Sequence, residues 1–200
     1  MTPGDAGASP THVLVVCTAN RCRSPLAGGL LRATLAERGQ SVEVETAGLG
    51  PPGFPATDET ITVAARRGLD LRDHRSEGLA PASISRADLV LAMERRHLQE
   101  IVVTLPSAWP RTFTLKEVVR RGETAGPRQS GELLASWLAR VHEQRERRDL
   151  MGASPLDDVT DPTGGTVADH EDLARELEDL VGRLADLLRP GLPPIRWSGS

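Results

Sequence analysis

The chain has 200 residues, 38% of them hydrophobic, and a formal net charge of −4. This length suits one domain with a sizeable core, and the acidic balance argues against wholesale binding of nucleic acid. No run of about 18 apolar residues occurs in the sequence, which argues against a membrane-spanning helix.

The chain begins with small, polar residues and then becomes apolar. Residues 1–11 lack the basic start and apolar core of a signal peptide, so we expect a disordered segment and a cytoplasmic protein. Residues 12–17 form a β-branched run that predicts a buried strand. Ser24 and Pro25 predict a helix start, because serine caps helices and proline fits the first helical position. Leucines then recur at helical spacing, so we expect this helix to cover residues 25–38.

The segment between this strand and this helix reads CTANRCRS and begins with Cys17. A tight loop before a helix N-terminus binds anions, because unpaired N–H groups and the helix dipole face the loop. These surroundings favour the thiolate of Cys17, the nucleophilic form of cysteine. The planar guanidinium of Arg23 can donate two parallel hydrogen bonds to two oxygens of a phosphoryl group. The spacing alone is not specific, and the alternative is an inert, buried Cys17 with a surface Arg23.

Other loop residues fit supporting roles. Ser24 can donate a hydrogen bond to the thiolate and assist its departure, and Asn20 can hold the loop through side-chain to backbone hydrogen bonds. The predicted phosphate-binding and loop-supporting positions are Thr18, Ala19, Asn20, Arg21, Cys22 and Ser24. Two Cys and five His show no zinc-ligand spacing, so we expect no metal and no cofactor.

Strands and helices alternate along the rest of the chain. The further predicted strands are at 42–46, 88–93 and 111–115. The further predicted helices are at 57–67, 94–103, 116–121 and 167–188. We interpret Glu94 as a favourable charge in a first helical turn. The alternation predicts one α/β domain over residues 12–188, in three layers, with a four-stranded parallel sheet flanked by helices. The Cys17 loop then lies at the carboxyl end of a strand, where such sheets bind ligands. Residues 189–200 should be a loose tail.

The segment at about 121–154 combines a polar loop, an apolar stripe and a charged run. The stripe at 133–141 has helical spacing and favours core packing over a partner surface. The run RVHEQRERRD at 140–149 is typical of a solvated face. Because this segment leads toward a later Asp-Pro, it could shape access to the site.

Transfer of a phosphoryl group to a thiolate leaves an oxyanion that needs a proton. An acid on a loop can supply it and then activate water as a base. Asp161 precedes Pro162 in a Gly-rich segment and is our candidate, with Asp158 as the second choice. The alternative is that Asp157, Asp158 and Asp161 are all solvated turn residues.

CTANRCRSP resembles the phosphate loop of the low-molecular-weight protein tyrosine phosphatases, a family that includes a branch of arsenate reductases. Further resemblances lie at 46–48, 68–71, 74–76, 87–94 and 161–165, and together they cover most of 12–188 except about 120–155. The resemblance implies a Rossmann-like phosphatase fold, Asp161 as general acid, and His74 as a support of the loop. Taken alone, His74 reads as a surface residue. The resemblance also implies a reversible Cys17–Cys22 disulfide, whereas Cys22 alone reads as a small buried hydrophobe.

The expected activity is hydrolysis of a phosphorylated protein or a small phosphomonoester through a phosphocysteine. The chain has no Tyr, and Phe54 is the single ring in the stretch 49–55. A mouth poor in aromatic residues weakens the case for phosphotyrosine and leaves room for phosphoarginine or sugar phosphates. Two alternatives remain, an arsenate reductase that uses a low-molecular-weight thiol and a non-catalytic phosphate-binding protein. The sequence does not predict the oligomeric state.

Overall fold

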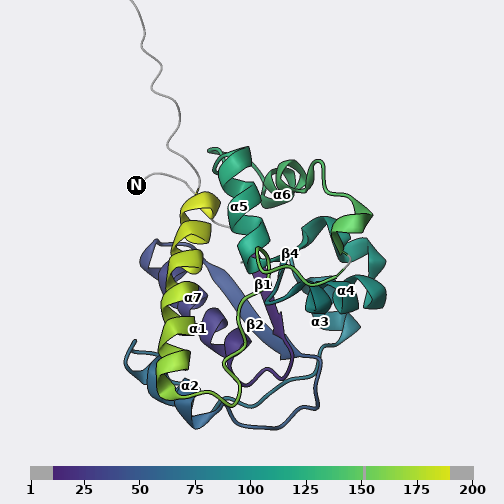
Figure 1. The fold of residues 1–200 in the computed structure, drawn as a ribbon. Helices are drawn as coiled ribbons and strands as arrows, with labels where there is room; N and C mark the ends of the chain where they lie inside the picture. Colours follow the sequence, from purple (N-terminus) through teal and green to yellow (C-terminus); the bar gives the residue numbers. More distant parts are fainter. Residues whose placement is uncertain (1–10, 151, 190–200) are drawn as a thin grey trace, which may run out of the picture.

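The computed structural model describes residues 11–150 and 152–189, and its centre is a parallel sheet (Figure 1). The strands are β1 (Thr11–Cys17), β2 (Val42–Gly48), β3 (Leu89–Ala92) and β4 (Thr112–Thr114). They pair in the order β2-β1-β3-β4, and every pair is parallel. The predicted four-stranded parallel sheet is therefore confirmed. Strand β1 lies inside the sheet, so its carboxyl end faces the ends of both neighbours.

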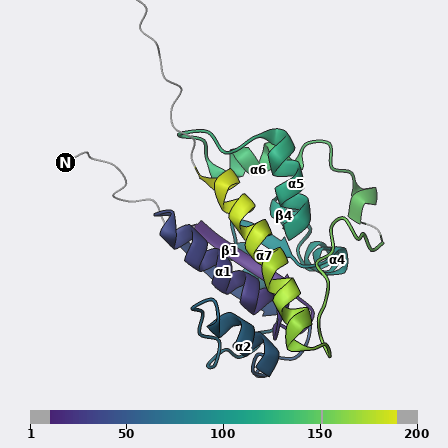
Figure 2. The same ribbon diagram turned by 60° about the vertical axis from the view of Figure 1, so that its left-hand side comes forward.

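Helices cover both faces of the sheet, which gives the predicted three layers (Figures 1 and 2). Alternate residues of β1 point to opposite sides, Val13 and Val15 into one core and Leu14 and Val16 into the other. The first core is completed by α1 (Arg23–Glu37), α2 (Asp58–Ala65), α5 (Leu115–Ala125), α6 (Leu134–His142) and α7 (Val167–Leu188). The second is completed by α3 (Pro81–Arg86), α4 (Arg95–Thr104) and the 3₁₀ helix η1 (Pro106–Arg111). A second 3₁₀ helix, η2 (Arg147–Leu150), follows α6.

Several element boundaries differ from the prediction. Helix α1 begins at Arg23 after Cys22, without a side-chain cap, because Ser24 lies inside the helix and bonds elsewhere. The helices α3 and η1 were not predicted. Each has six residues and begins at a proline, too short a stretch for a hydrophobic period to register. Of the predicted disordered segment 1–11, Thr11 belongs to β1 and the rest lies outside the described residues. Of the predicted tail, Arg189 caps α7 and residues 190–200 lie outside the described residues.

The segment 121–154 packs against the rest of the fold. Trp137, Leu138 and Val141 of α6 are buried in the first core, which confirms the core-packing interpretation of the apolar stripe. The solvated-face interpretation of the charged run is wrong for Arg145, whose side chain is 0% exposed and pairs with Glu117 at 2.9 Å.

The Arg145 guanidinium fills a slot between two aromatic rings. Its central carbon lies 3.7 Å from the ring centre of Trp109 and 4.1 Å from that of Phe113. Cation–π contact and a buried ion pair therefore fasten the segment that follows α6 to α5 and β4.

Across residues 11–150 and 152–189, no helix has both the length and the apolar character needed to cross a membrane.

Candidate active site

The loop between β1 and α1 has a fixed backbone shape. Asn20 has a φ of 53°, in the left-handed region that Asn tolerates better than most residues. The neighbouring end of β2 approaches the loop closely at Gly48. A Cβ atom on Gly48 would lie 2.7 Å from the backbone nitrogen of Asn20, too close for any side chain. Gly48 also donates its N–H to the carbonyl of Glu77 at 2.8 Å, which ties β2 to the chain before α3.

Cys17 lies at the base of the loop, where hydrogen bonds surround its sulfur. The backbone N–H of Asn20 donates to Sγ at 3.2 Å, and the Ser24 hydroxyl lies 3.0 Å from Sγ. The side-chain amide of Asn20 donates to Ser24 Oγ at 2.8 Å, which leaves the Ser24 hydrogen for the sulfur or for the Ala47 carbonyl at 3.4 Å. These contacts suit a negatively charged sulfur.

Asn20 and His74 connect the loop to the stretch before α3. Asn20 Oδ1 accepts from the backbone N–H of Glu77 at 2.8 Å, the side-chain to backbone bond that we predicted for Asn20. His74 Nε2 lies 2.7 Å from the Asn20 carbonyl oxygen. The structure therefore brings His74, 54 residues away in sequence, into contact with the loop.

Arg23 is 1% exposed and its guanidinium is surrounded by acceptors. Its Nη2 donates to Thr18 Oγ1 at 3.0 Å and to Asp161 Oδ2 at 2.5 Å. Its Nη1 donates to the Val159 carbonyl at 3.1 Å and to the Glu94 carboxylate. Both of its carboxylate partners are distant in sequence, so only the fold brings them together.

Glu94 does more than the favourable helix-turn charge that we expected. It precedes α4 at the carboxyl end of β3, next to β1, and there it pairs with Arg23. Burial disfavours its charged form, but hydrogen bonds from Arg96 and Arg23 hold the pKa of Glu94 below its usual range. Sequence reasoning missed Arg96 and His97 as well. Arg96 Nη2 donates to Thr18 Oγ1 at 2.8 Å, and His97 Nε2 lies 3.0 Å from the same oxygen.

The loop that carries Asp161 is anchored by two other aspartates. Asp157 is 2% exposed and accepts from Arg95 and Arg120, each at 2.8 Å. Asp158 accepts from the backbone N–H groups of Arg95, at the start of α4, and of Ser154. Both aspartates hold the loop through these bonds, and the second-choice acid Asp158 accepts from two backbone N–H groups. The Asp161 side chain is 32% exposed and reaches Arg23.

Cys22 is buried on the other side of the loop. Burial raises the pKa of Cys22 to about 12, although a hydrogen bond with Thr60 opposes the shift. Both cysteines are free thiols in this structure. Cys22 thus resembles a small buried hydrophobe here. The remaining predicted loop positions, Ala19 and Arg21, lie at the outer turn, and Arg21 donates Nε to the Pro55 carbonyl at 2.8 Å.

The mouth of the loop has one exposed ring. Phe54 is 47% exposed, and the Arg21 guanidinium lies 5.6 Å from its ring centre. An open groove of about 700 Å³ runs from the Asp161 loop along α7. Its acidic lining residues are Asp161, Asp169, Asp172 and Glu176.

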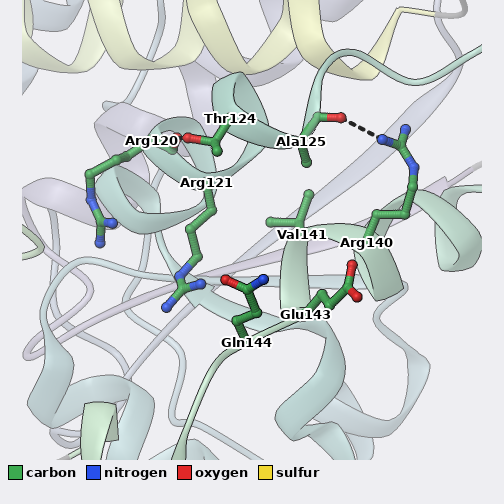
Figure 3. Close-up of a pocket in the computed structure, with 8 residues that line it drawn as sticks. All are labelled: Arg120, Arg121, Thr124, Ala125, Arg140, Val141, Glu143 and Gln144. Carbon is green, nitrogen blue, oxygen red and sulfur yellow. Dashed lines mark hydrogen bonds between the residues drawn. The ribbon is translucent and has the colours of Figure 1, made fainter.

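A second cavity, of about 390 Å³, lies between α5 and the end of α6, and none of its lining residues belongs to the phosphate loop (Figure 3). Arg140 turns toward the Ala125 carbonyl, to which it donates at 2.5 Å. Within the described part of the chain, no group of three or more His, Cys, Asp and Glu is arranged to hold a metal ion. The Asn20 N–H and the Ser24 hydroxyl face the Cys17 sulfur, and we take this loop as the candidate site.

Known proteins are similar to this chain. Residues 12–127 match the family described as "Low molecular weight phosphotyrosine protein phosphatase". The probable low molecular weight protein-tyrosine-phosphatase EpsP of Ralstonia nicotianae is 40% identical over 107 residues, 53% of this chain and 71% of that protein. The protein-arginine-phosphatase of Geobacillus stearothermophilus is 32% identical over 181 residues, 90% of this chain and 97% of that protein.

Solved structures agree with the sequence comparison. A low molecular weight protein tyrosine phosphatase from T. tengcongensis superposes with a TM-score of 0.66 at 32% identity, covering 87% of this chain and 97% of that one. A YwlE mutant from Bacillus subtilis superposes with a TM-score of 0.67 at 29% identity, covering 88% and 96%.

Proposed function

Because the chain belongs to the low molecular weight phosphotyrosine protein phosphatase family, we propose that it hydrolyses phosphoproteins through a phosphocysteine formed on Cys17. The observation that carries this proposal is the convergence of Cys17 Sγ, the Arg23 guanidinium and the Asp161 carboxylate on one loop. The nucleophile, the phosphate-binding cation and the acid are then within reach of one phosphoryl group.

In the first step, the Cys17 thiolate attacks phosphorus, an S–P bond forms and the bond to the leaving group breaks. The N–H groups of the loop and the Arg23 fork stabilise the charge that develops on the equatorial oxygens. Asp161, in its protonated form, gives its proton to the departing atom of the substrate.

In the second step, the Asp161 carboxylate takes a proton from water as the water oxygen attacks phosphorus. The S–P bond breaks and inorganic phosphate leaves. Ser24 supports this departure, because its hydroxyl lies 3.0 Å from Sγ and can donate to the thiolate that is released.

The resting site has to rearrange before this chemistry. Arg23 Nη2 donates to Asp161, so the carboxylate occupies a donor that a phosphoryl oxygen would use. Phosphate binding therefore releases Asp161 from Arg23, and the freed carboxyl group is then able to face the leaving group.

The experiment is turnover of p-nitrophenyl phosphate near pH 6 by wild type and by Cys17→Ser, followed by acid quench and mass spectrometry. The proposal expects wild type to carry a transient addition of one phosphoryl group on Cys17 and Cys17→Ser to lose turnover. Phosphate release by Cys17→Ser at the wild-type rate would overturn it. Arsenate-dependent oxidation of a small thiol, without phosphate release, would favour the arsenate reductase alternative.

Phosphoarginine is a second candidate substrate beside phosphotyrosine. The alignment with a protein-arginine-phosphatase extends over 90% of this chain. In addition, Thr163 and Gly164 follow Pro162, so that this side of the mouth offers no ring to stack on a phosphotyrosine. Comparing kcat/KM for matched phosphoarginine and phosphotyrosine peptides tests this candidate, and a preference for phosphotyrosine would exclude it. The cytoplasmic location stays a prediction.

A further inference from the structure

Three nitrogen atoms converge on the hydroxyl oxygen of Thr18. Arg23 Nη2 lies 3.0 Å from Thr18 Oγ1, Arg96 Nη2 lies 2.8 Å from it, and His97 Nε2 lies 3.0 Å from it. Thr18 follows the cysteine directly at the entrance of the loop, whereas His97 lies in the first turn of α4. The contact therefore joins two residues that are 79 positions apart in the sequence.

The hydrogen-bonding capacity of a hydroxyl group fixes the direction of each bond. A threonine hydroxyl has one hydrogen to donate and two lone pairs to accept with. A guanidinium group only donates, so Arg23 and Arg96 together use both lone pairs. The Thr18 hydrogen is then left for His97, and His97 Nε2 must be the acceptor. A proton on Nε2 would place a third donor against an oxygen that has no free lone pair.

The surroundings of His97 support a neutral ring. The residue is 0% exposed, and its Nδ1 atom is buried without a hydrogen-bond partner. The charged groups that face the ring are Glu94, Arg23, Arg96 and Asp161. Burial lowers the pKa of His97 to about 4, with Glu94 and Asp161 opposing the shift and the two arginines adding to it.

We propose that His97 is a positioning residue of the phosphate site, in which the neutral imidazole accepts a hydrogen bond from the Thr18 hydroxyl and so directs the Thr18 lone pairs toward Arg23 and Arg96. This inference rests on the proposed function, since it assigns the orientation of the arginine that binds the phosphoryl group. The Thr18 bond holds one Nη2 hydrogen of Arg23, which leaves the other for the phosphoryl oxygen that displaces Asp161.

The first test reads the ring directly in the resting, wild-type protein. A long-range proton–nitrogen correlation spectrum of the histidine rings distinguishes a proton on Nδ1 from one on Nε2. The proposal expects His97 with its proton on Nδ1 at pH 7 and no change in this signal down to about pH 5. An Nε2-protonated ring, or a charged ring at pH 6, would overturn the proposal without any variant.

The second test measures affinity for inorganic phosphate by calorimetry. His97→Phe keeps a ring of similar size but removes the acceptor, and Thr18→Val removes the hydroxyl. Each should weaken phosphate binding about tenfold, the effect of one lost hydrogen bond near a charged group. His97→Gln offers an amide oxygen and Thr18→Ser retains the hydroxyl, so both should bind phosphate within about threefold of wild type.

The double variant tests whether His97 acts through Thr18. If it does, adding His97→Phe to Thr18→Val costs less than a further twofold, because the contact is already lost. Independent, multiplying losses would overturn the proposal, and so would normal phosphate affinity in a folded His97→Phe protein.

His170 supplies a matched control. It is 1% exposed and also has a buried, unpartnered ring nitrogen, but it lies in α7 and its Nδ1 lies 2.9 Å from the Thr166 carbonyl oxygen instead of a loop atom. His170→Phe should leave phosphate affinity unchanged, and an equal loss in this variant would overturn the proposal by showing that any buried histidine has the effect. Neither test needs turnover. A Cys17→Ser protein that still hydrolyses substrate would refute the phosphocysteine mechanism and leave these results standing.

Discussion

The Asp161 carboxylate lies 2.5 Å from the Arg23 guanidinium. In the resting site, the candidate acid is therefore paired with the candidate phosphate-binding group. The Arg23 side chain is 1% exposed and that of Asp161 is 32% exposed. The arginine is fixed by Glu94, Thr18 and the Val159 carbonyl, and the aspartate is therefore the partner that moves.

Removing the charge of Asp161 should strengthen phosphate binding in the resting protein. Asp161→Asn removes a competitor for Arg23 Nη2, and an ion pair of this exposure is worth about 1 kcal/mol, or roughly a fivefold lower Kd. Calorimetry with inorganic phosphate measures the change. Asp172→Asn, in the same groove without contact to Arg23, is the control and should bind like wild type. Weaker binding by Asp161→Asn would contradict the competition.

Asp161→Ala should lose turnover in proportion to the basicity of the leaving group. General acid catalysis contributes about 10²–10⁴-fold, so we expect kcat/KM for phenyl phosphate, which reports the first step, to fall by roughly 10³-fold. For p-nitrophenyl phosphate, whose leaving group needs little protonation, the loss should be at least about tenfold smaller. Equal losses on both substrates would argue that Asp161 only shapes the site.

One thiol of the two should react with iodoacetamide at pH 7. Cys17 is surrounded by hydrogen-bond donors, whereas burial raises the pKa of Cys22 to about 12, which leaves it protonated. Intact mass should show one added group in wild type and in Cys22→Ser, and none in Cys17→Ser. Phosphate should slow the reaction. Labelling of Cys22 in the folded protein would contradict this prediction.

The buried imidazole of His97 should make stability fall in mild acid. Its pKa of about 4 in the folded protein lies below the ordinary value of 6.5, so between these values the unfolded chain binds a proton that the folded chain does not. The free energy of unfolding should therefore decrease as pH falls from about 6.5 to 4, by roughly 3 kcal/mol from this group. Urea unfolding at pH 7 and 4.5 should show a smaller decrease in His97→Phe. If His97→Phe lost as much unfolding free energy as wild type between pH 7 and 4.5, His97 would not be the source of the acid sensitivity.

Arg145→Lys should destabilise the protein strongly despite keeping the charge. A lysine has no planar group to stack between Trp109 and Phe113, and it cannot donate two parallel hydrogen bonds to Glu117 as Arg145 does. Disrupting a buried pair of this kind costs about 3 kcal/mol. Arg148→Lys lies in the same charged run with its side chain 78% exposed, and it should stay within about 0.5 kcal/mol of wild type. Urea unfolding checks both, and equal effects would contradict the burial argument.

The sequence predicted what is encoded locally. The β-branched run of β1, the helix that follows it and the loop between them all lie within residues 11–37, so their relation is legible without the fold. The parallel sheet followed from the alternation of strands and helices. Asp161 was found because its Asp-Pro-Thr-Gly-Gly context resembles a known acid loop, although its contact with Arg23 spans 138 residues.

The missed residues depend on strand order. Glu94, Arg96 and His97 meet the Cys17 loop because β3 pairs with β1, and nothing near residue 94 in the sequence states that pairing. The carboxyl ends of neighbouring parallel strands share one edge, so polar residues just after β3 were a usable signal that we did not apply. The burial of Arg145 was equally invisible, because its partner Glu117 and its two aromatic neighbours come from other elements.

Gly48 is important to the site because it has no side chain. The end of β2 approaches the Cys17 loop so closely that even a methyl group would strike the amide of Asn20, the same amide that donates to the Cys17 sulfur. A substitution at position 48 would therefore disturb the loop around Cys17 without changing any residue of the proposed reaction. For anyone redesigning this scaffold, that glycine belongs among the invariant positions, because the space it leaves empty keeps the cradle in shape.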